Sequence, residues 1–328
     1  MTWLVTGGAG YIGAHVVLAM REAGEEVVVL DDLSSGDAGR IPGVPLVVGS
    51  VLDGPLVRRT LRGRGVTGIV HVAAKKQVEE SVRRPLFYYR QNVEGLRVLL
   101  QEAGEAGVTD LVFSSSAAVY GAPDVDLVRE ETECRPVNPY GTTKLAGERM
   151  IAEVAAATGL RHATLRYFNV AGTADPALTD RGVSNLVPMV FQRLAEGLPP
   201  VVFGEDHATP DGTCVRDFVH VSDVASAHVA AARALADGRV TALTANVGRG
   251  EGTSVREMVE TIRTVTGTAD EAWSRPVVAP ARPGDPARVV AAADTIRTVL
   301  GWRSRYGVPE MAASAWAGWT RRHPHPIG

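Results

Sequence analysis

The stretch that decides the fold is Thr6-Gly7-Gly8-Ala9-Gly10-Tyr11-Ile12-Gly13. It follows an apolar run with strand character, Trp3–Thr6, and precedes a helix-like segment, Tyr11–Ala23. Glycines spaced Gly-x-x-Gly-x-x-Gly between a strand and a helix let the backbone approach a pyrophosphate, and the helix N-terminus directs free N–H groups at the phosphates. The stretch therefore predicts a dinucleotide-binding unit at the start of the chain.

Two carboxylates stand where such a unit needs an acceptor for ribose hydroxyls. Asp31 and Asp32 follow the apolar run Glu26–Leu30, at the expected spacing of ~20 residues from the glycines. A carboxylate there binds adenosine ribose hydroxyls and repels a 2′-phosphate, which favours NAD over NADP. The competing interpretation is a solvated strand end without a ligand.

The first half of the chain continues as alternating strands and helices. Further strands are expected at Leu46–Val48, Gly68–Val72, Asp110–Ser114 and His162–Tyr167, and helices at Pro85–Ala106 and Pro139–Thr158. Continuous Val, Ile and Leu runs are typical of parallel strands covered on both faces, and the alternation predicts right-handed crossovers. We expect an α/β fold with a Rossmann-type doubly wound parallel sheet.

After Gly172 the alternation stops, and Gly, Pro and polar residues become frequent. Helices are expected at Asn185–Glu196, Val221–Ala236, Ser254–Thr266 and Asp294–Gly301. We therefore expect an NAD-binding domain over residues 1–172 and a smaller, irregular α/β substrate-binding domain over residues 173–328. Segments around residues 214–250 are candidates to pack back onto the first domain.

Composition excludes several classes of protein. The formal net charge of −3 over 328 residues argues against nucleic-acid binding, which normally needs a basic domain. Cys134 and Cys214 form neither a metal-ligand spacing nor a disulfide framework, which favours a reducing compartment, and no metal is expected. The chain begins on a strand-like run and contains no apolar stretch of the ~18 residues that span a bilayer. We expect a cytoplasmic protein without a membrane partner.

A Tyr/Lys pair predicts acid–base chemistry. Tyr140 and Lys144 are four residues apart just after Pro139, so both lie on one face of the expected helix. An ammonium beside a phenol favours the phenolate, which can take a proton from a sugar hydroxyl while NAD takes hydride. Ser114, Ser115 and Ser116 end the preceding strand, where ligands bind in parallel sheets. A Tyr and a Lys four residues apart often occur by chance. The glycine turn, the acidic strand end and these serines strengthen the prediction of a catalytic site.

These residues belong to a set of motifs that resembles the UDP-glucose (UDP-galactose) 4-epimerases nearly from end to end. The matching stretches are TGGAGYIG at Thr6–Gly13, SSSAAVYG at Ser114–Gly121, NPYGTTK at Asn138–Lys144, RYFNVAG at Arg166–Gly172, DGTCVRDFVHVSD at Asp211–Asp223 and RPGDPA at Arg282–Ala287. The first and third are shared by many extended short-chain dehydrogenase/reductases, whereas the block ending FVHVSD together with RYFN is more specific. The resemblance implies an NAD-dependent isomerase that interconverts UDP-glucose and UDP-galactose at C4 through a transient 4-keto intermediate.

The resemblance also implies roles for individual residues. Tyr140, Lys144 and Ser116 would be catalytic. The implied cofactor contacts are Gly7, Gly10, Tyr11, Ile12, Gly13, Asp31, Asp32, Ser50, Val51, Val72, Ala73, Ala74, Lys76, Asn92, Ser114, Tyr140, Lys144 and Phe168. The implied substrate contacts are Lys76, Ser116, Tyr140, Asn169, Asn185, Leu186, Val201, Phe203, Arg216, Arg282 and Asp285, with the two arginines on the diphosphate and Asp285 on the uridine ribose. A homodimer built on the helices at Pro85–Ala106 and Pro139–Thr158 is also implied.

Three departures from the family pattern bear on function. Ser50 stands where the family usually has an adenine-contacting Asp, which predicts weaker NAD anchoring. Ala118 replaces a Thr that commonly contacts a substrate hydroxyl. Val289 occupies a position whose side-chain size varies with acceptance of N-acetylated sugars, so UDP-N-acetylhexosamines are candidate substrates.

The residues that follow Ser116 also bear on other functions of the same scaffold. Ser116 is followed by Ala117 and Ala118 and not by an acid, which argues against dehydratase or decarboxylase chemistry. The alternative is C4 epimerisation of UDP-glucuronate or a UDP-pentose. A non-catalytic dinucleotide sensor is the least favoured, because such proteins tend to lose the Tyr or the Lys and both are present.

Overall fold

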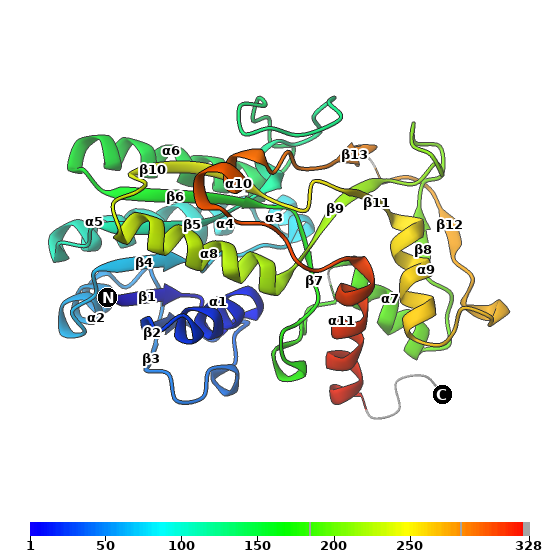
Figure 1. The fold of residues 1–328 in the computed structure, drawn as a ribbon, viewed down its shortest axis with the longest axis horizontal. Helices are drawn as coiled ribbons and strands as arrows, with labels where there is room; N and C mark the ends of the chain where they lie inside the picture. The colour runs from blue at the N-terminus through cyan, green and yellow to red at the C-terminus, as the bar shows by residue number, and fades with distance from the viewer. Residues whose placement is uncertain (184, 283, 324–328) are drawn as a thin grey trace.

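The computed structural model describes residues 1–183, 185–282 and 284–323. Its main layer is a parallel seven-stranded sheet in the order β10-β6-β5-β4-β1-β2-β3 (Figure 1). The strands are β1 (Thr2–Thr6), β2 (Glu26–Asp31), β3 (Leu46–Val48), β4 (Gly68–His71), β5 (Asp110–Ser116), β6 (Arg161–Tyr167) and β10 (Ala242–Val247). The expected doubly wound α/β fold is confirmed.

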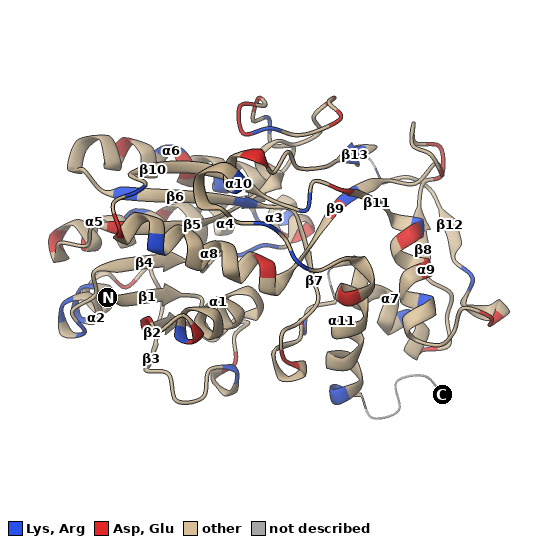
Figure 2. Ribbon diagram, viewed as in Figure 1, with Lys and Arg blue, Asp and Glu red and all other residues tan. Residues whose placement is uncertain are grey.

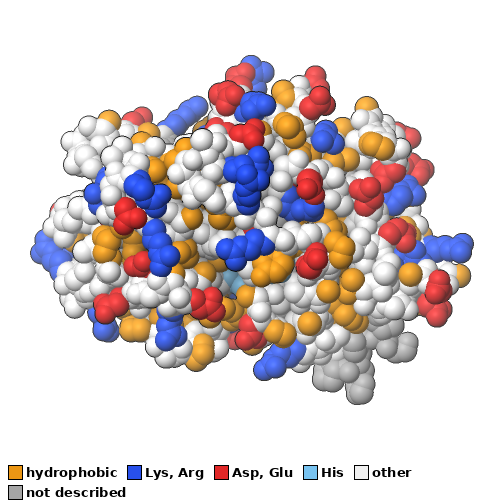
Figure 3. Space-filling model, viewed as in Figure 1, with side chains coloured by type: hydrophobic (Ala, Val, Ile, Leu, Met, Phe, Trp, Pro, Cys, Tyr) orange, Lys and Arg blue, Asp and Glu red, His pale blue; other side chains and the backbone are white. Residues whose placement is uncertain are grey.

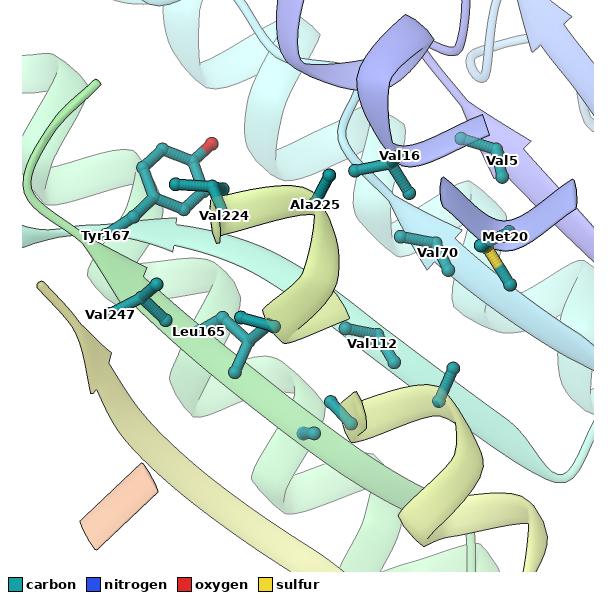
Figure 4. Close-up of a cluster of buried hydrophobic side chains, with 14 of the residues drawn as sticks. Val5, Val16, Met20, Val70, Val112, Leu165, Tyr167, Val224, Ala225 and Val247 are labelled. Atoms are coloured by element: carbon teal, nitrogen blue, oxygen red, sulfur yellow. The ribbon is translucent and has the colours of Figure 1, made fainter. Parts of the chain in front are cut away.

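Helices cover both faces of this sheet. One face carries α1 (Tyr11–Glu22) and α8 (Val221–Ala236), and the other carries α2 (Gly54–Gly63), α5 (Gly95–Ala106) and α6 (Pro139–Thr158). Successive strand residues point to opposite faces, so Val5, Val70, Val112 and Leu165 pack against α1 and α8 (Figure 4), while the alternate residues Leu4, Ile69, Leu111 and Phe113 pack under α2, α5 and α6. Strands β1 and β4 at the centre carry no charged residue (Figure 2).

The expected helix over residues 85–106 contains a local irregularity. It consists of α4 (Pro85–Tyr88), a π-helical stretch η2 (Tyr89–Glu94) and α5. π-helical turns often occur at functional sites, and this one carries Asn92. The short helix α3 (Val78–Arg83) precedes it.

The second half builds a smaller unit beyond the carboxyl ends of the large sheet (Figure 1). Its strand β9 (Val215–His220) pairs with β7 (Asn169–Ala171), β11 (Gly252–Ser254) and β13 (Arg288–Val289), and β8 (Val201–Phe203) pairs with β12 (Val277–Ala279). Helices α7 (Leu186–Ala195), α9 (Val255–Val265) and α11 (Val308–Arg322) pack around an apolar core that includes Phe191, Phe218 and Trp319. The remaining helical elements are α10 (Asp294–Leu300) and the short turns η1 (Ala38–Arg40), η3 (Ala117–Val119), η4 (Pro176–Leu178) and η5 (Ala272–Ser274).

The chain crosses between the two units more than once. It leaves the large sheet after β6 at Tyr167 and returns to it with α8 and β10. Residues 221–247 therefore build the first unit as well, although they lie beyond residue 172. Strand β10 and helix α11 were not among the expected elements.

The described residues contain no helix long and apolar enough to cross a membrane. On the face shown in Figure 3, acidic and basic side chains are interspersed.

Candidate active site

The glycine turn forms the floor of a cleft at the carboxyl ends of β1, β2 and β4. Gly7 has φ +71°, and a Cβ on it would lie 2.7 Å from the backbone nitrogen of Ala73. A Cβ on Gly13 would lie 2.0 Å from the carbonyl oxygen of Gly7. These contacts exclude side chains and keep the backbone open to a ligand. Helix α1 begins after Gly10 without a side-chain cap, so its first N–H groups are free to bind phosphate.

The acidic strand end is held rigidly beside this turn. Asp31 is buried, and its two carboxylate oxygens accept hydrogen bonds from Ala9 N at 2.9 Å and Leu33 N at 2.8 Å. Asp32 accepts from the Ser34 N–H and hydroxyl. Partial burial acts to raise the pKa of Asp32, but these hydrogen bonds and the Lys75 charge outweigh it and leave the pKa below its ordinary value. Asp31 and Asp32 both line the cleft.

Most of the expected cofactor contacts line this one cleft. They are Gly7, Gly10, Tyr11, Ile12, Gly13, Asp31, Asp32, Ser50, Val51, Val72, Ala73, Ala74, Lys76, Tyr140 and Lys144. A glycine cradle, an uncapped helix start and paired carboxylates in one cleft fit NAD, with its diphosphate at α1 and its adenosine ribose at Asp31 and Asp32.

The Tyr/Lys pair lies at the end of the same cleft. Asn138 caps α6 by accepting from Gly141 N at 2.9 Å, and Tyr140 and Lys144 follow in the first turns. Tyr140 is 8% exposed and Lys144 is 3% exposed. Burial raises the pKa of Tyr140, and its hydrogen bond with Ser116 acts in the opposite direction. Burial lowers the pKa of Lys144 to about 8, while the charge of Glu148 acts to raise it.

Lys144 is anchored to the neighbouring strand. Its Nζ donates to the Ser114 carbonyl at 2.7 Å and lies 4.9 Å from the centroid of the Phe113 ring. An ammonium has three N–H groups, so the contact with Ser114 leaves donors for a ligand. Ser116, at the end of the same strand β5, accepts from Ala118 N at 3.2 Å.

Three expected cofactor contacts do not line the cleft: Asn92, Ser114 and Phe168. Asn92 accepts from Lys75 N at 2.8 Å and donates to Lys75 O and Thr143 Oγ1, both at 3.0 Å. It therefore ties the loop after β4 to α6, which carries the Tyr/Lys pair. Phe168 is buried in an apolar cluster with Val119 and Val289.

The expected substrate contacts lie mainly in the smaller unit. Arg216 donates to Pro286 O at 2.7 Å and pairs with Asp285 at 3.5 Å. The Arg282 guanidinium lies 3.9 Å from the centroid of the Phe203 ring. Two arginines, a carboxylate and an aromatic ring thus gather between β8, β9 and the segment before β13, a set suited to a nucleoside diphosphate.

The other expected substrate contacts are less closely grouped. Asn169 is exposed on β7, and exposed Asn185 donates to Asp180 at 2.9 Å. Leu186 is half-buried at the start of α7 and packs against the core of the smaller unit, and Val201 is half-buried on β8. Among the residues the structure describes, no group of three or more His, Cys, Asp or Glu is placed to hold a metal ion.

Other residues reach the cleft without having been expected there. They are Leu30, Ser34, Ser35, Gly49, Lys75, Gln91 and Tyr167. Ser34 and Ser35 follow the acidic pair directly, so their position in the sequence is a usable signal. Tyr167 ends strand β6 and has no such signal, because an aromatic residue at the end of a buried strand is usually part of the core.

The sheet, its glycine turn and the buried Tyr/Lys pair together define the class of short-chain dehydrogenase/reductase proteins. A model of the NAD dependent epimerase/dehydratase family matches residues 3–248. The UDP-glucose 4-epimerase of Azospirillum brasilense is 44% identical over 331 residues, which cover 99% of this chain and 93% of that protein. That of Streptomyces lividans is 44% identical over 333 residues, covering 98% and 97%. The chain belongs to the NAD-dependent epimerase/dehydratase family.

A solved structure supports the same placement. The UDP-glucose 4-epimerase from Stenotrophomonas maltophila, with bound NAD and formylated UDP-arabinopyranose, has a TM-score of 0.92, 40% sequence identity and 99% coverage of both chains. The family, the fold class and NAD as cofactor, all expected from the sequence motifs, are confirmed.

Proposed function

We propose that this chain interconverts UDP-glucose and UDP-galactose by epimerisation at C4. The observation that carries the proposal is the position of Tyr140 and Lys144. Both line the cleft that is otherwise built by the glycine turn and the acidic strand end, so a proton acceptor stands at the end of the cofactor site. The full-length relatives from Azospirillum brasilense and Streptomyces lividans, both UDP-glucose 4-epimerases, support the same reaction.

Tyr140 is the acid and base of this reaction. It takes the proton of the C4 hydroxyl as the 4-keto sugar forms and returns it afterwards. NAD, when bound, supplies a reversible acceptor for hydride. Lys144, with its pKa lowered by burial to about 8, is still mainly protonated at neutral pH, so it presents a positive charge on the same helix as Tyr140. Ser116, hydrogen-bonded with Tyr140, orients the same hydroxyl.

The nucleotide is held apart from this chemistry. Arg216 and Arg282 neutralise the diphosphate, and Asp285 accepts from the uridine ribose. Asn169, Asn185, Leu186, Val201 and Phe203 complete the pocket, with Lys76 at the cofactor side. Anchoring through the nucleotide lets the 4-keto sugar turn and present its other face before Tyr140 returns the proton.

Substrate range depends on the departures from the family pattern. Ala118 removes one hydroxyl contact, and Val289 is 7% exposed within the cluster that contains Phe168. A side chain of medium size there leaves room for UDP-N-acetylhexosamines. The alternative substrate is a UDP-pentose or UDP-glucuronate, and the formylated UDP-arabinopyranose bound to the Stenotrophomonas relative supports the UDP-pentose.

The assembly we infer is a homodimer without nucleic-acid or membrane partners. Apolar side chains of α3, α4 and η2 are exposed beside α6: Val82 at 61%, Leu86 at 82% and Tyr89 at 41%. A second copy of the chain would cover this face. Cys134 and Cys214 are both free thiols, which supports a reducing, cytoplasmic location. We also propose residues 1–172 with 221–247 as the NAD-binding domain and the rest as the UDP-sugar-binding domain.

The decisive experiment is incubation of purified protein with UDP-galactose, with and without added NAD, and separation of the products by chromatography. UDP-glucose should form, and Tyr140→Phe, which removes only the phenol oxygen, should abolish its formation. Turnover of UDP-glucuronate or a UDP-pentose instead would favour the alternative. Failure with every UDP-sugar would leave a non-catalytic dinucleotide-binding protein.

A further inference from the structure

Ser114 is a junction between the catalytic lysine and a histidine on the opposite face of the sheet. It is fully buried at the carboxyl end of β5, and its carbonyl accepts from Lys144 Nζ at 2.7 Å. Its hydroxyl lies 2.7 Å from Nε2 of His228, which is fully buried on α8. Helices α6 and α8 are thus joined through one residue of the strand between them.

The contacts of His228 fix the direction of this hydrogen bond. Its Nδ1 lies 2.8 Å from the carbonyl oxygen of Val224, and because a carbonyl only accepts, Nδ1 must carry the proton. Burial lowers the pKa of His228 to about 4, so the ring is neutral near pH 7 and its Nε2 is an acceptor. The Ser114 hydroxyl therefore donates to His228.

Tyr167, at the end of β6, lies beside His228. Its ring centroid lies 6.3 Å from that of His228. Figure 4 shows the Tyr167 ring beside Val224 at the start of α8. Tyr167 lines the cleft together with Tyr140 and Lys144, so its orientation shapes the catalytic end of the cofactor site.

We propose that His228 is a positioning residue for the epimerisation site: by accepting the Ser114 proton it fixes the end of β5, where the Ser114 carbonyl holds Lys144. The inference rests on the proposed function, since it assigns His228 to the same Tyr140 and Lys144 chemistry. His228 itself is fully buried and is not among the residues that line the cleft. Its contribution is to fix the direction of the hydrogen bond from the Ser114 hydroxyl, behind the cleft.

Three variants separate the hydrogen bond from the space that the ring fills. His228→Leu keeps an apolar side chain without an acceptor, and His228→Gln keeps an oxygen able to accept from Ser114. We expect His228→Leu to lower kcat with UDP-galactose at least tenfold while KM changes less than threefold, and His228→Gln to retain at least a third of kcat. The control is His162→Leu at the far end of β6, whose Nδ1 has no hydrogen-bond partner among the described residues; its kcat should stay within twofold.

A readout that does not depend on turnover tests the same hydrogen bond. In protein labelled with ¹⁵N-histidine, the signals of His228 are identified as those that are absent from His228→Gln. In the unaltered chain, we expect their chemical shifts to show a neutral ring with its proton on Nδ1 from pH 5 to pH 8. Ser114→Ala should shift that Nε2 signal. A ring that titrates near its ordinary pKa, or that carries its proton on Nε2, would overturn the proposal.

A double-mutant cycle keeps the test decisive if a single variant is unstable. If His228 acts through Ser114, then His228→Leu combined with Ser114→Ala should be no slower than the slower single variant. The role would be refuted if the kcat losses of the two single variants multiplied in the double variant. It would also be refuted if His228→Leu and His228→Gln were folded and lost kcat equally, or if the kcat of His228→Leu stayed within twofold of that of the unaltered chain. Absence of turnover by the unaltered chain would count against the proposed function, while the ¹⁵N measurement would still decide the hydrogen bond.

Discussion

Lys144 brings a charge into a site from which water is almost excluded. Its side chain is 3% exposed, and burial lowers its pKa to about 8 from the ordinary 10.5. Below pH 8 the folded protein bears the full cost of this buried ammonium. Between pH 8 and 10.5 the folded state releases the proton that the unfolded state keeps, so stability rises with pH over this window.

Replacing Lys144 by Met should therefore stabilise the cofactor-free protein while abolishing epimerisation. We expect Lys144→Met to raise the free energy of unfolding by about 1–3 kcal/mol at pH 7, and the gain to shrink towards pH 10. Urea denaturation of both proteins at pH 7 and pH 9.5 measures the difference. A variant that is less stable at pH 7, or a gap that does not depend on pH, would contradict this account.

Ser50 lines the cofactor cleft, and its hydroxyl oxygen accepts from Leu52 N at 3.2 Å. A carboxylate is a stronger acceptor than a hydroxyl for an amine donor, so Ser50→Asp should lower the Kd for NAD several-fold, measured by calorimetry on cofactor-free protein. Ser50→Ala is the matched control and should bind NAD no tighter than the unaltered chain. Equal affinity of Ser50→Asp and the unaltered chain would show that this position does not limit NAD retention.

At the scale of elements, α6 is fixed to the sheet by a buried ion pair. Glu148 and Arg166, at 9% and 8% side-chain exposure, join α6 to β6 with Nη2 2.6 Å from Oε2. Ser115 on β5 donates to the same carboxylate, and Arg166 Nη1 donates to the Tyr120 hydroxyl at 2.9 Å. The helix that carries Tyr140 and Lys144 is thus held to two adjacent strands.

Removing one charge of this pair leaves the other buried without a partner. Glu148→Gln should lower the free energy of unfolding by roughly 3–5 kcal/mol, measured by urea denaturation. The exposed pair Arg97–Glu94, at 48% and 46% side-chain exposure, provides the control, and Glu94→Gln should change stability by less than about 1 kcal/mol. Similar losses of unfolding free energy in Glu148→Gln and Glu94→Gln would show that burial does not determine how much an ion pair contributes to stability here.

Elements with local signals were predictable from the sequence, and those that depend on distant partners were not. The bounds of α6 coincide with the expected Pro139–Thr158, because Asn138 and Pro139 mark its start and Gly159, at φ +77°, its end. Strand β10 was missed; its neighbour in the sheet, β6, lies some 80 residues earlier in the chain. Likewise, nothing in the sequence around Ser114 indicates that its partner is His228.

At the scale of the whole molecule, one large apolar side chain of the described residues lies almost uncovered. Leu86 is 82% exposed on α4, with Val82 at 61% and Tyr89 at 41% nearby in the chain. Burying apolar side chains stabilises association by about 25 cal/mol per Å², and the same helices pack on α6 and the Asn92 turn. A partner seated there would also brace α6, the helix that carries Tyr140 and Lys144.

A charge at the centre of this face should separate the proposed dimer. We expect Leu86→Glu to sediment as a monomer at micromolar concentration where the unaltered chain sediments as a dimer, because the buried carboxylate would lack a partner. Val299→Glu, at 41% exposure on α10, is the control and should remain dimeric. If the unaltered chain is a monomer, or if Leu86→Glu remains a dimer, this face is not the interface. Loss of epimerase activity in the Leu86→Glu monomer, with its thermal unfolding unchanged, would further indicate that the dimer holds α6 in its active position.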